Sequence, residues 1–410
     1  MTKSRTKLNM GFIVLLYFML KPLYIGESGD LQIADVFLLL MVAVFLGQQH
    51  LVIRMRSDSR QLIVLFGWLI LYQLLDNLIW SGITGDLLMN RRTLYYVFNF
   101  IAFSFTIVIG DRIGTEELLH YLGLGCFWSA VVVLVGLVTA TSSSVRSVGF
   151  FNNPNQLGYF GVVVLSGTIL CHRQMSAPQR LLIFGVSFWA VVASLSKAAI
   201  LGYIGLVFLY ILFFQARRTL KRVILQILLF ALLALAIYLL LFSESRIVTS
   251  NRTLLVMRER ILYMSEENDT NLRNGRGYGR ILEMGYNHLW GMGEGAYDRF
   301  VSRHDTEVHS TYASLLVSYG LIGLIWYGVI LFKCLGRPSQ WGRSIPTMSG
   351  ILLYSITHNG VRNTLVWMLM AVLYLVNRAE REKATAGLEP DRSPLLDRSP
   401  IDGPDLFGSL

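Results

Sequence analysis

Long apolar blocks separated by short polar segments dominate the chain. Most blocks approach the ~17–25 residues that a helix needs to cross a hydrocarbon core of ~30 Å, whereas a large soluble domain would show buried segments of about 10–14 residues. The expected fold class is therefore all-α, a polytopic membrane protein with about 12 transmembrane helices. These helices are predicted over residues 10–26, 33–50, 61–79, 94–110, 118–139, 157–171, 180–194, 198–214, 223–242, 311–334, 345–358 and 363–377.

The long polar stretches divide the chain into regions. Residues 243–310 form the only sizeable segment between two predicted helices, so 1–242 would hold nine helices and 311–377 the last three. Residues 378–410 follow the last helix and contain the near repeat DRSPLLDRSP. Pro, Ser and Asp at that density cannot build an apolar core, so we expect a disordered tail there.

Composition agrees with the apolar blocks and the charges add an orientation. Of 410 residues, 54% are hydrophobic and 15% are charged, and the net charge is +10. A cytoplasmic N-terminus places most basic residues of the short loops inside, as Lys and Arg prefer. The inner set is Arg54, Arg56, Arg60, Arg112, Arg173, Arg180, Arg217, Arg218, Lys221, Arg222, Lys333, Arg337, Arg343, Arg378, Arg381 and Lys383. We therefore predict cytoplasmic termini and interpret the charge as a topology signal, not a nucleic-acid footprint.

One polar segment, FFNNPNQLGYF, interrupts the chain where a predicted helix begins on the outer side. Asn152 or Asn153 can cap the helix, and Pro154 suits its first position. A cap does not explain Asn155 and Gln156, because unpaired amides are costly inside a membrane span. A cap alone and a cap with polar contacts to a substrate both remain open.

A second outer segment, SLSKAAILG, places Lys197 beside Ser194 and Ser196 at the start of a predicted helix. A lysine at a membrane interface often only extends its amine toward water. A helix N-terminus with a lysine and two hydroxyls is also a good anion site, because the free amides and the dipole add to the charge.

The large outer loop contains RNGRGYGRILEMGYNHLWGMGEGAYDRF. Arg276 and Arg280 would share a helix face at i and i+4, where like charges repel, which favours an anionic partner over a merely solvated basic loop. The glycines permit tight turns and close backbone approach. They do not form a nucleotide fingerprint, because no strand precedes GMGEG within a βαβ unit.

Histidines accompany the last outer segments. His309, with Glu307 two residues earlier, precedes a predicted helix in EVHSTYASLLVSYGLIGL, and His358 and Arg362 occur in THNGVRNTLVW. Imidazole titrates near neutral pH, so His309 is a candidate base or orienting group, although capping or packing would also explain it. For His358 and Arg362, anchoring at the membrane interface is the simpler interpretation and a substrate contact is the other.

Together these segments resemble the O-antigen ligase and O-antigen polymerase family of bacterial envelope proteins. The resemblance rests on FFNNPNQLGYF, SLSKAAILG, RGYGRI followed by GMGEGAYDRF, and EVHSTYASLLVSYGLIGL, in this order and with one large outer loop before the last. It covers about residues 148–330 and is greatest for exopolysaccharide polymerase members.

The resemblance implies a glycosyltransferase of the bacterial inner membrane with a periplasmic active site. A glycan on polyprenyl diphosphate would be attacked at its anomeric carbon by an acceptor sugar hydroxyl, and polyprenyl diphosphate would leave without help from a metal or other cofactor. Chain-length and export proteins are possible partners. The implied catalytic residues are His309, Arg280, Arg276 and Lys197, the last at a position where ligases usually have arginine. The implied substrate-binding residues are Asn152, Asn153, Asn155, Gln156, Glu307 and Arg362.

The residues themselves suit this reaction. Negative charge grows on a departing diphosphate, and cations aimed at it in a partly dehydrated pocket stabilise the transition state. The outer face shows no paired aspartates of the kind that bind a metal. A ligase that transfers glycan to lipid A core or to a protein remains an alternative. A transporter of lipid-linked glycan is another, although inverted repeats and polar residues near the midplane, typical of transporters, are not evident.

Overall fold

The computed structural model describes residues 2–26, 31–48, 55–87, 90–139, 146–213, 285–295 and 308–387, together with Ile224, Leu228, Arg258, Tyr278 and Ile281. Helices dominate these residues. They are α1 (Thr2–Leu20), α2 (Ile33–Gln48), α3 (Ser57–Thr84), α4 (Asn90–Ile113), α5 (Thr115–Thr139), α6 (Pro154–Leu170), α7 (Ala177–Ser194), α8 (Lys197–Phe213), α15 (Thr311–Leu335), α16 (Trp341–Thr357) and α17 (Thr364–Thr385). Short 3₁₀ turns η1 (His172–Gln174), η2 (Gly285–His288) and η3 (Pro338–Gln340) lie between some of them.

The predicted spans correspond to these helices, with one exception. The span predicted over 223–242 lies almost wholly outside the described residues, as does most of the predicted loop 243–310. The other eleven coincide with α1 to α8 and α15 to α17 within the described residues. Several helices are longer than their apolar blocks, and α3 runs for 28 residues because its polar ends continue the helical backbone.

The last helix corrects the predicted start of the tail. α17 continues to Thr385, so the disorder predicted from residue 378 is wrong for its first residues. Arg378 explains the difference, because its side chain is 5% exposed and pairs with Asp111 of α4 at 2.6 Å and with Glu382 of α17 at 3.5 Å. Residues 388–410 lie outside the described part of the chain.

The protein is a multi-pass membrane protein. Among the described residues, five helices are long and apolar enough to cross a membrane: α3, most of α4, α5, α7 and α15. α3 exposes Trp68, Leu75, Leu78 and Ile79 along its outer face, each more than half exposed. A row of large exposed apolar side chains on one helix suits lipid and not water.

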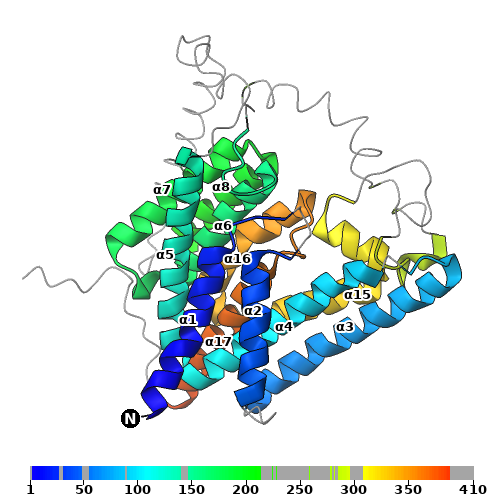
Figure 1. Cartoon of the computed structure of the whole chain (residues 1–410), viewed down its shortest axis with the longest axis horizontal. Helices are drawn as coiled ribbons and strands as arrows, with labels where there is room; N and C mark the ends of the chain where they lie inside the picture. Colours follow the sequence, from blue (N-terminus) through cyan, green and yellow to red (C-terminus); the bar gives the residue numbers. More distant parts are fainter. Residues whose placement is uncertain are drawn as a thin grey trace, which may run out of the picture.

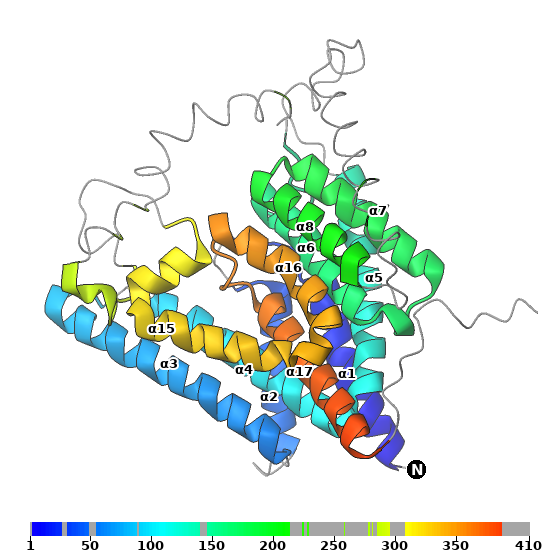
Figure 2. The same cartoon turned by 180° about the vertical axis from the view of Figure 1, so that it is seen from behind.

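Two groups of helices enclose a central pair. Figures 1 and 2 show α16 and α17 between α5 to α8 on one side and α3, α4 and α15 on the other. α17 packs against α4, α15, α5 and α6 and buries every residue from Thr364 to Arg378. Trp367, in the first turn of α17, is stacked on Phe66 at 4.5 Å between ring centroids and edge-on to Tyr327 at 5.8 Å.

Glycines bring α8 and α16 into close contact. A Cβ atom at Gly202 would meet the Gly350 carbonyl oxygen at 2.6 Å, and one at Gly350 would meet the Gly202 carbonyl oxygen at 2.8 Å. Such small residues let membrane helices approach until their backbones touch, which replaces the missing hydrophobic driving force with van der Waals contact. This contact fixes the end of α16, where the candidate site begins.

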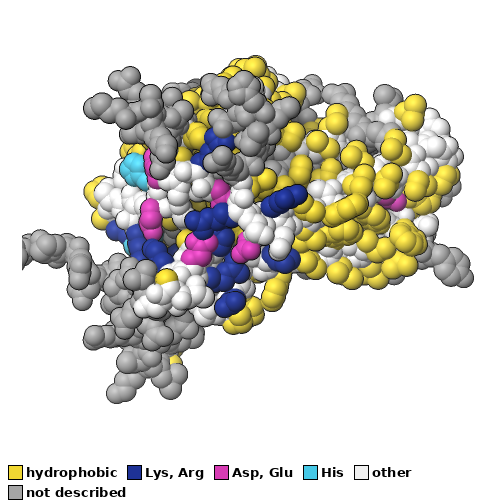
Figure 3. Space-filling model, turned by 90° about the horizontal axis from the view of Figure 1, so that it is seen from below, with side chains coloured by type: hydrophobic (Ala, Val, Ile, Leu, Met, Phe, Trp, Pro, Cys, Tyr) yellow, Lys and Arg dark blue, Asp and Glu magenta, His cyan; other side chains and the backbone are white. Residues whose placement is uncertain are grey.

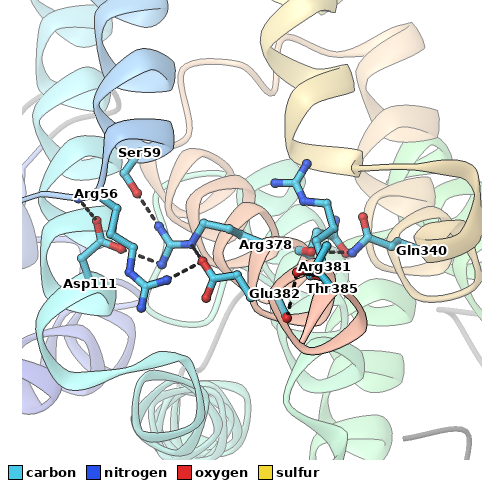
Figure 4. Close-up of polar contacts among 9 residues, drawn as sticks. Arg56, Ser59, Asp111, Gln340, Arg378, Arg381, Glu382 and Thr385 are labelled. Atoms are coloured by element: carbon cyan, nitrogen blue, oxygen red, sulfur yellow. Dashed lines mark hydrogen bonds and ion pairs between the residues drawn. The ribbon is translucent and has the colours of Figure 1, made fainter. Parts of the chain in front are cut away.

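Basic and acidic side chains gather at one end of the bundle, which we call the charged end. It consists of Arg56, Asp111, Glu116, Arg343, Arg378, Glu380, Glu382 and Lys383. Figure 3 shows the face on which these charges lie beside a broad apolar surface, and Figure 4 shows Arg378 between Ser59, Asp111 and Glu382. Arg56, Arg343, Arg378 and Lys383 belong to the loops predicted to lie inside, so the structure brings them to one end. Which compartment that end faces stays a prediction.

Candidate functional site

A cavity of about 800 Å³ opens at the other end of the bundle. Its walls come from the C-terminal ends of α1 and α16 and from the N-terminal ends of α2, α4, α6 and α17. α4 and α17 have their opposite termini at the charged end, so the cavity and the charged end lie at the two ends of the same helices.

The cavity unites predicted site residues from distant parts of the chain. Asn153, Asn155 and Gln156 come from the start of α6, His309 precedes α15, and Arg362 precedes α17. All five line the cavity. A pocket with a few convergent polar groups is the usual form of a small-molecule site.

The amide segment is both a helix cap and a wall of the cavity. Asn153 is the N-cap of α6, and its side-chain oxygen accepts a hydrogen bond from the Asn155 amide at 2.8 Å. Asn155 in turn accepts a bond from the Arg146 guanidinium at 2.7 Å. Asn152 does not line the cavity, and its side-chain amide donates to the Gly26 carbonyl instead.

Aromatic and imidazole rings form a continuous row along one wall. The rings of Tyr159 and Tyr354 stack at 4.0 Å between centroids, Tyr354 meets His358 at 4.9 Å, and His358 stacks on His309 at 6.3 Å. The sequence interpretation that treated His358 as an interface anchor missed this pairing. Each imidazole carries two ring nitrogens, so the pair offers several hydrogen-bonding atoms to a bound hydroxyl.

The segment around His309 is held from several sides. Ser310 caps α15 and accepts a hydrogen bond from the Ala313 amide at 3.3 Å. The amide and hydroxyl of Thr311 both donate to the His358 carbonyl at 3.2 Å, which joins the two histidine segments. The Tyr278 hydroxyl donates to the His309 carbonyl at 3.2 Å, so one residue of the predicted loop 243–310 lies directly beside the cavity wall.

The glycine-rich turn GMGEG packs against a kink in α15. The Met292 amide donates to the Val317 carbonyl and the Gly293 amide to the Ser318 carbonyl, both at 3.0 Å. Gly320 has φ 63° and ψ −168° inside α15, and a Cβ there would meet the Leu289 carbonyl oxygen at 2.2 Å. Within the turn, Gly291 has φ 93°, and a Cβ there would meet the Ser318 carbonyl oxygen at 2.4 Å. This glycine thus serves close backbone approach, as predicted, and the turn places Glu294 in the interior.

Glu294 forms an ion pair with Arg362. The Glu294 side chain is 1% exposed and the Arg362 side chain 22% exposed, and the guanidinium donates to the carboxylate. The same guanidinium lies over the Tyr95 ring at 5.9 Å from its centroid. Asn99 donates to the Arg362 carbonyl at 3.4 Å, so both the backbone and the side chain of this arginine are held.

A second ion pair, Lys21 with Asp35, lines another part of the cavity. The Lys21 amine lies 2.6 Å from the Asp35 carboxylate, and both side chains are below a tenth exposed. The Tyr17 hydroxyl and the backbone amide of Gln32 also donate to this carboxylate, at 2.8 and 3.1 Å. The aromatic rings of Tyr24 and Phe151 lie nearby, 5.3 Å apart.

Some predicted site residues do not line the cavity, and others lie outside the described residues. Lys197 begins α8 but does not line the cavity. The link between the α8 entry and the site comes instead from Arg146, which donates to the Ser194 carbonyl at 2.8 Å. Arg276, Arg280 and Glu307 lie outside the described residues.

The sequence interpretation missed several cavity residues. Lys21 and Asp35 carried a signal, because ionisable residues within apolar runs usually mark functional positions in membrane proteins. Arg92, which also lines the cavity, and Glu294, which pairs with the lining residue Arg362, carried none, since only the fold brings them to this end of the bundle. Within the described part of the chain no group of three or more His, Cys, Asp or Glu residues could hold a metal, and the expected metal independence stays a prediction.

Comparisons with known proteins address the family. No curated protein matches the chain. Residues 182–328 match the family model described as O-Antigen ligase. The matched region includes Lys197, Glu294 and His309 and ends before Arg362. Residues 182–328 therefore carry a domain of the O-antigen ligase and polymerase family, whose members are glycosyltransferases that act on lipid-linked glycans, and this domain lies within a multi-pass membrane protein.

Proposed function

We propose that the protein polymerises oligosaccharide units carried on polyprenyl diphosphate, at the periplasmic face of the bacterial inner membrane. The product would be a surface polysaccharide or exopolysaccharide. The observation that carries the proposal is the cavity that unites His309, the amide segment at the start of α6, and Arg362.

The charge of the cavity favours an anionic substrate group. Among the described residues, Lys21, Arg92 and Arg362 line it with Asp35 as the one acidic lining residue, and Glu294 lies buried behind Arg362. Three basic side chains and two histidines thus line the cavity. Basic side chains in a confined, partly dehydrated volume attract a diphosphate and stabilise the charge that it gains on leaving.

The wall around Lys21 and Asp35 suits sugars. This pair is electrically balanced and is accompanied by aromatic rings and by the amides of Asn153 and Gln156. Sugar rings are neutral, rich in hydroxyls and flat enough to contact aromatic faces, so such a wall complements them. We assign the Arg362 wall to the diphosphate and the Lys21 wall to the glycan.

The reaction would be a single displacement. An acceptor sugar hydroxyl forms a bond to the anomeric carbon, and the bond from that carbon to the diphosphate oxygen breaks, so that the electron pair leaves with polyprenyl diphosphate. His309 takes the hydroxyl proton or orients the hydroxyl, and holding both chains in one cavity supplies proximity. Arg276 and Arg280 join the proposal because Tyr278, between them in sequence, contacts the His309 segment.

Product analysis tests the proposal. The purified protein is given a polyprenyl-diphosphate oligosaccharide in EDTA, beside the variants His309→Ala and Arg280→Ala. We expect a ladder of extended lipid-linked glycan from the intact protein and none from the variants. A single transfer to added lipid A core would identify a ligase instead. Movement of the lipid across a vesicle bilayer without any transfer would identify a transporter and overturn the proposal.

A further inference from the structure

We infer that Glu294 is a positioning residue, which holds the Arg362 guanidinium in the orientation that binds the departing diphosphate. The inference rests on the proposed function, because it assigns a role within the same cavity. Glu294 does not line the cavity, so it would act only through the arginine that does.

The backbone of Glu294 is fixed more firmly than a loop residue usually is. Its turn is bonded to the kink of α15 through the amides of Met292 and Gly293, both at 3.0 Å. Its own amide donates to the Asn77 side chain of α3. Asn77 also donates to the Thr93 hydroxyl at 2.5 Å, next to the cavity residue Arg92. The carboxylate therefore approaches Arg362 from a rigid base made of α3, α4 and α15.

A buried carboxylate at this place restricts the arginine strongly. With 1% of its side chain exposed, Glu294 has little water to replace a lost partner, so separating the pair would leave a costly buried charge. A guanidinium offers five donors in one plane, more than one carboxylate oxygen can use. The pair thus fixes that plane while Arg362 still lines the cavity.

Orientation matters here because the ligand is a diphosphate. A guanidinium binds phosphate oxygens through two parallel hydrogen bonds, which require its plane to face them. Negative charge on the diphosphate grows as the glycosidic bond breaks, so a misplaced plane costs more in the transition state than in the bound substrate. Loss of Glu294 should therefore lower kcat more than it raises KM.

A double-mutant cycle tests the inference. Glu294→Gln, Arg362→Gln and the double variant are compared with the unchanged protein in two measurements, kinetics with the lipid-linked donor and affinity for inorganic diphosphate. We expect Glu294→Gln to lower kcat about tenfold, to raise the donor KM about threefold and to weaken diphosphate binding about threefold. These effects should vanish in the Arg362→Gln background, since residues that act as one unit are not additive.

Controls separate positioning from folding and from the proposed function. Glu380→Gln removes a carboxylate that pairs with Arg343 at the charged end, and it should leave both measurements unchanged. Glu294→Asp keeps the charge, so it should recover part of the lost turnover. An equal effect of Glu294→Gln with and without Arg362 overturns the inference. A protein without turnover could still bind diphosphate, with a loss of affinity in Glu294→Gln that vanishes in the Arg362→Gln background. That result would overturn the proposed function and leave the inference standing.

Discussion

The two ends of the bundle use the same kinds of charged residue for different purposes. At the charged end four basic side chains, Arg56, Arg343, Arg378 and Lys383, pair with four acidic ones, Asp111, Glu116, Glu380 and Glu382. At the cavity end, the basic side chains of Lys21, Arg92 and Arg362 line about 800 Å³ of open volume within the described part of the chain. Charges that pair between helices join them, whereas basic side chains that line a cavity can attract a ligand.

One arginine at each end, Arg378 and Arg362, makes the comparison direct. Arg378 contacts Asp111, Glu382 and the Ser59 hydroxyl and is 5% exposed, so its donors serve three helices. Arg362 contacts Glu294 and Tyr95 and retains a surface on the cavity. Both are arginines beside a buried carboxylate, and only the surroundings separate a structural role from a proposed functional one.

The largest effect is expected from a substitution that breaks the ion pair between Asp111 and Arg378 at the charged end. Asp111→Asn leaves the Arg378 guanidinium buried without its closest carboxylate, and we expect a loss of about 3–5 kcal/mol of stability. Thermal unfolding of the purified protein in detergent measures the loss. Turnover per folded molecule should not change, because Asp111 lies far from the cavity. A drop in turnover without a drop in stability would show that the two ends are not separate in function.

A smaller effect sharpens the interpretation of the cavity end. Asn153→Ser keeps a side-chain oxygen at the α6 cap, so stability should change by less than about 0.5 kcal/mol. It removes an amide from the cavity wall, and we expect the substrate KM to rise about tenfold, equivalent to ~1.4 kcal/mol. Steady-state kinetics measures the KM. The matched control is Ser176→Asn, which makes the reverse exchange at the cap of α7. An unchanged KM would favour the interpretation of this segment as a cap alone.

The smallest effect concerns pH and lies outside the membrane-spanning helices. Burial, with Arg180 and Arg173 nearby, lowers the pKa of His172 in η1 from 6.5 to about 4. The unfolded chain therefore binds the proton more readily, so the stability from neutral His172 is present above pH 6.5 and is lost as the pH falls toward 4. The unfolding temperature should drop between pH 7.5 and 5, and less so in His172→Gln. An equal drop in both proteins would contradict this assignment.

Much of the fold could be predicted because hydrophobic length is a local property. The blocks that became α2, α5 and α8 were predicted within a few residues of their observed bounds. The end of α17 could not be, because Arg378 looks like the polar start of a tail until Asp111 is beside it. A charged residue continues a buried helix only where a distant partner compensates it, and sequence order does not reveal that partner.

The candidate site divides in the same way. The sequence by itself determined the chemistry available, namely the amides of FFNNPNQLGYF, the histidine of EVHST and the glycines that permit close approach. Only the tertiary structure decided which of these share a cavity: His358 joined His309, Lys197 stayed off the wall, and Glu294 became the partner of Arg362. Residue types and caps are encoded over a few neighbouring positions. A cavity forms where helices from opposite ends of the chain meet, so its members are fixed by packing and not by order along the sequence.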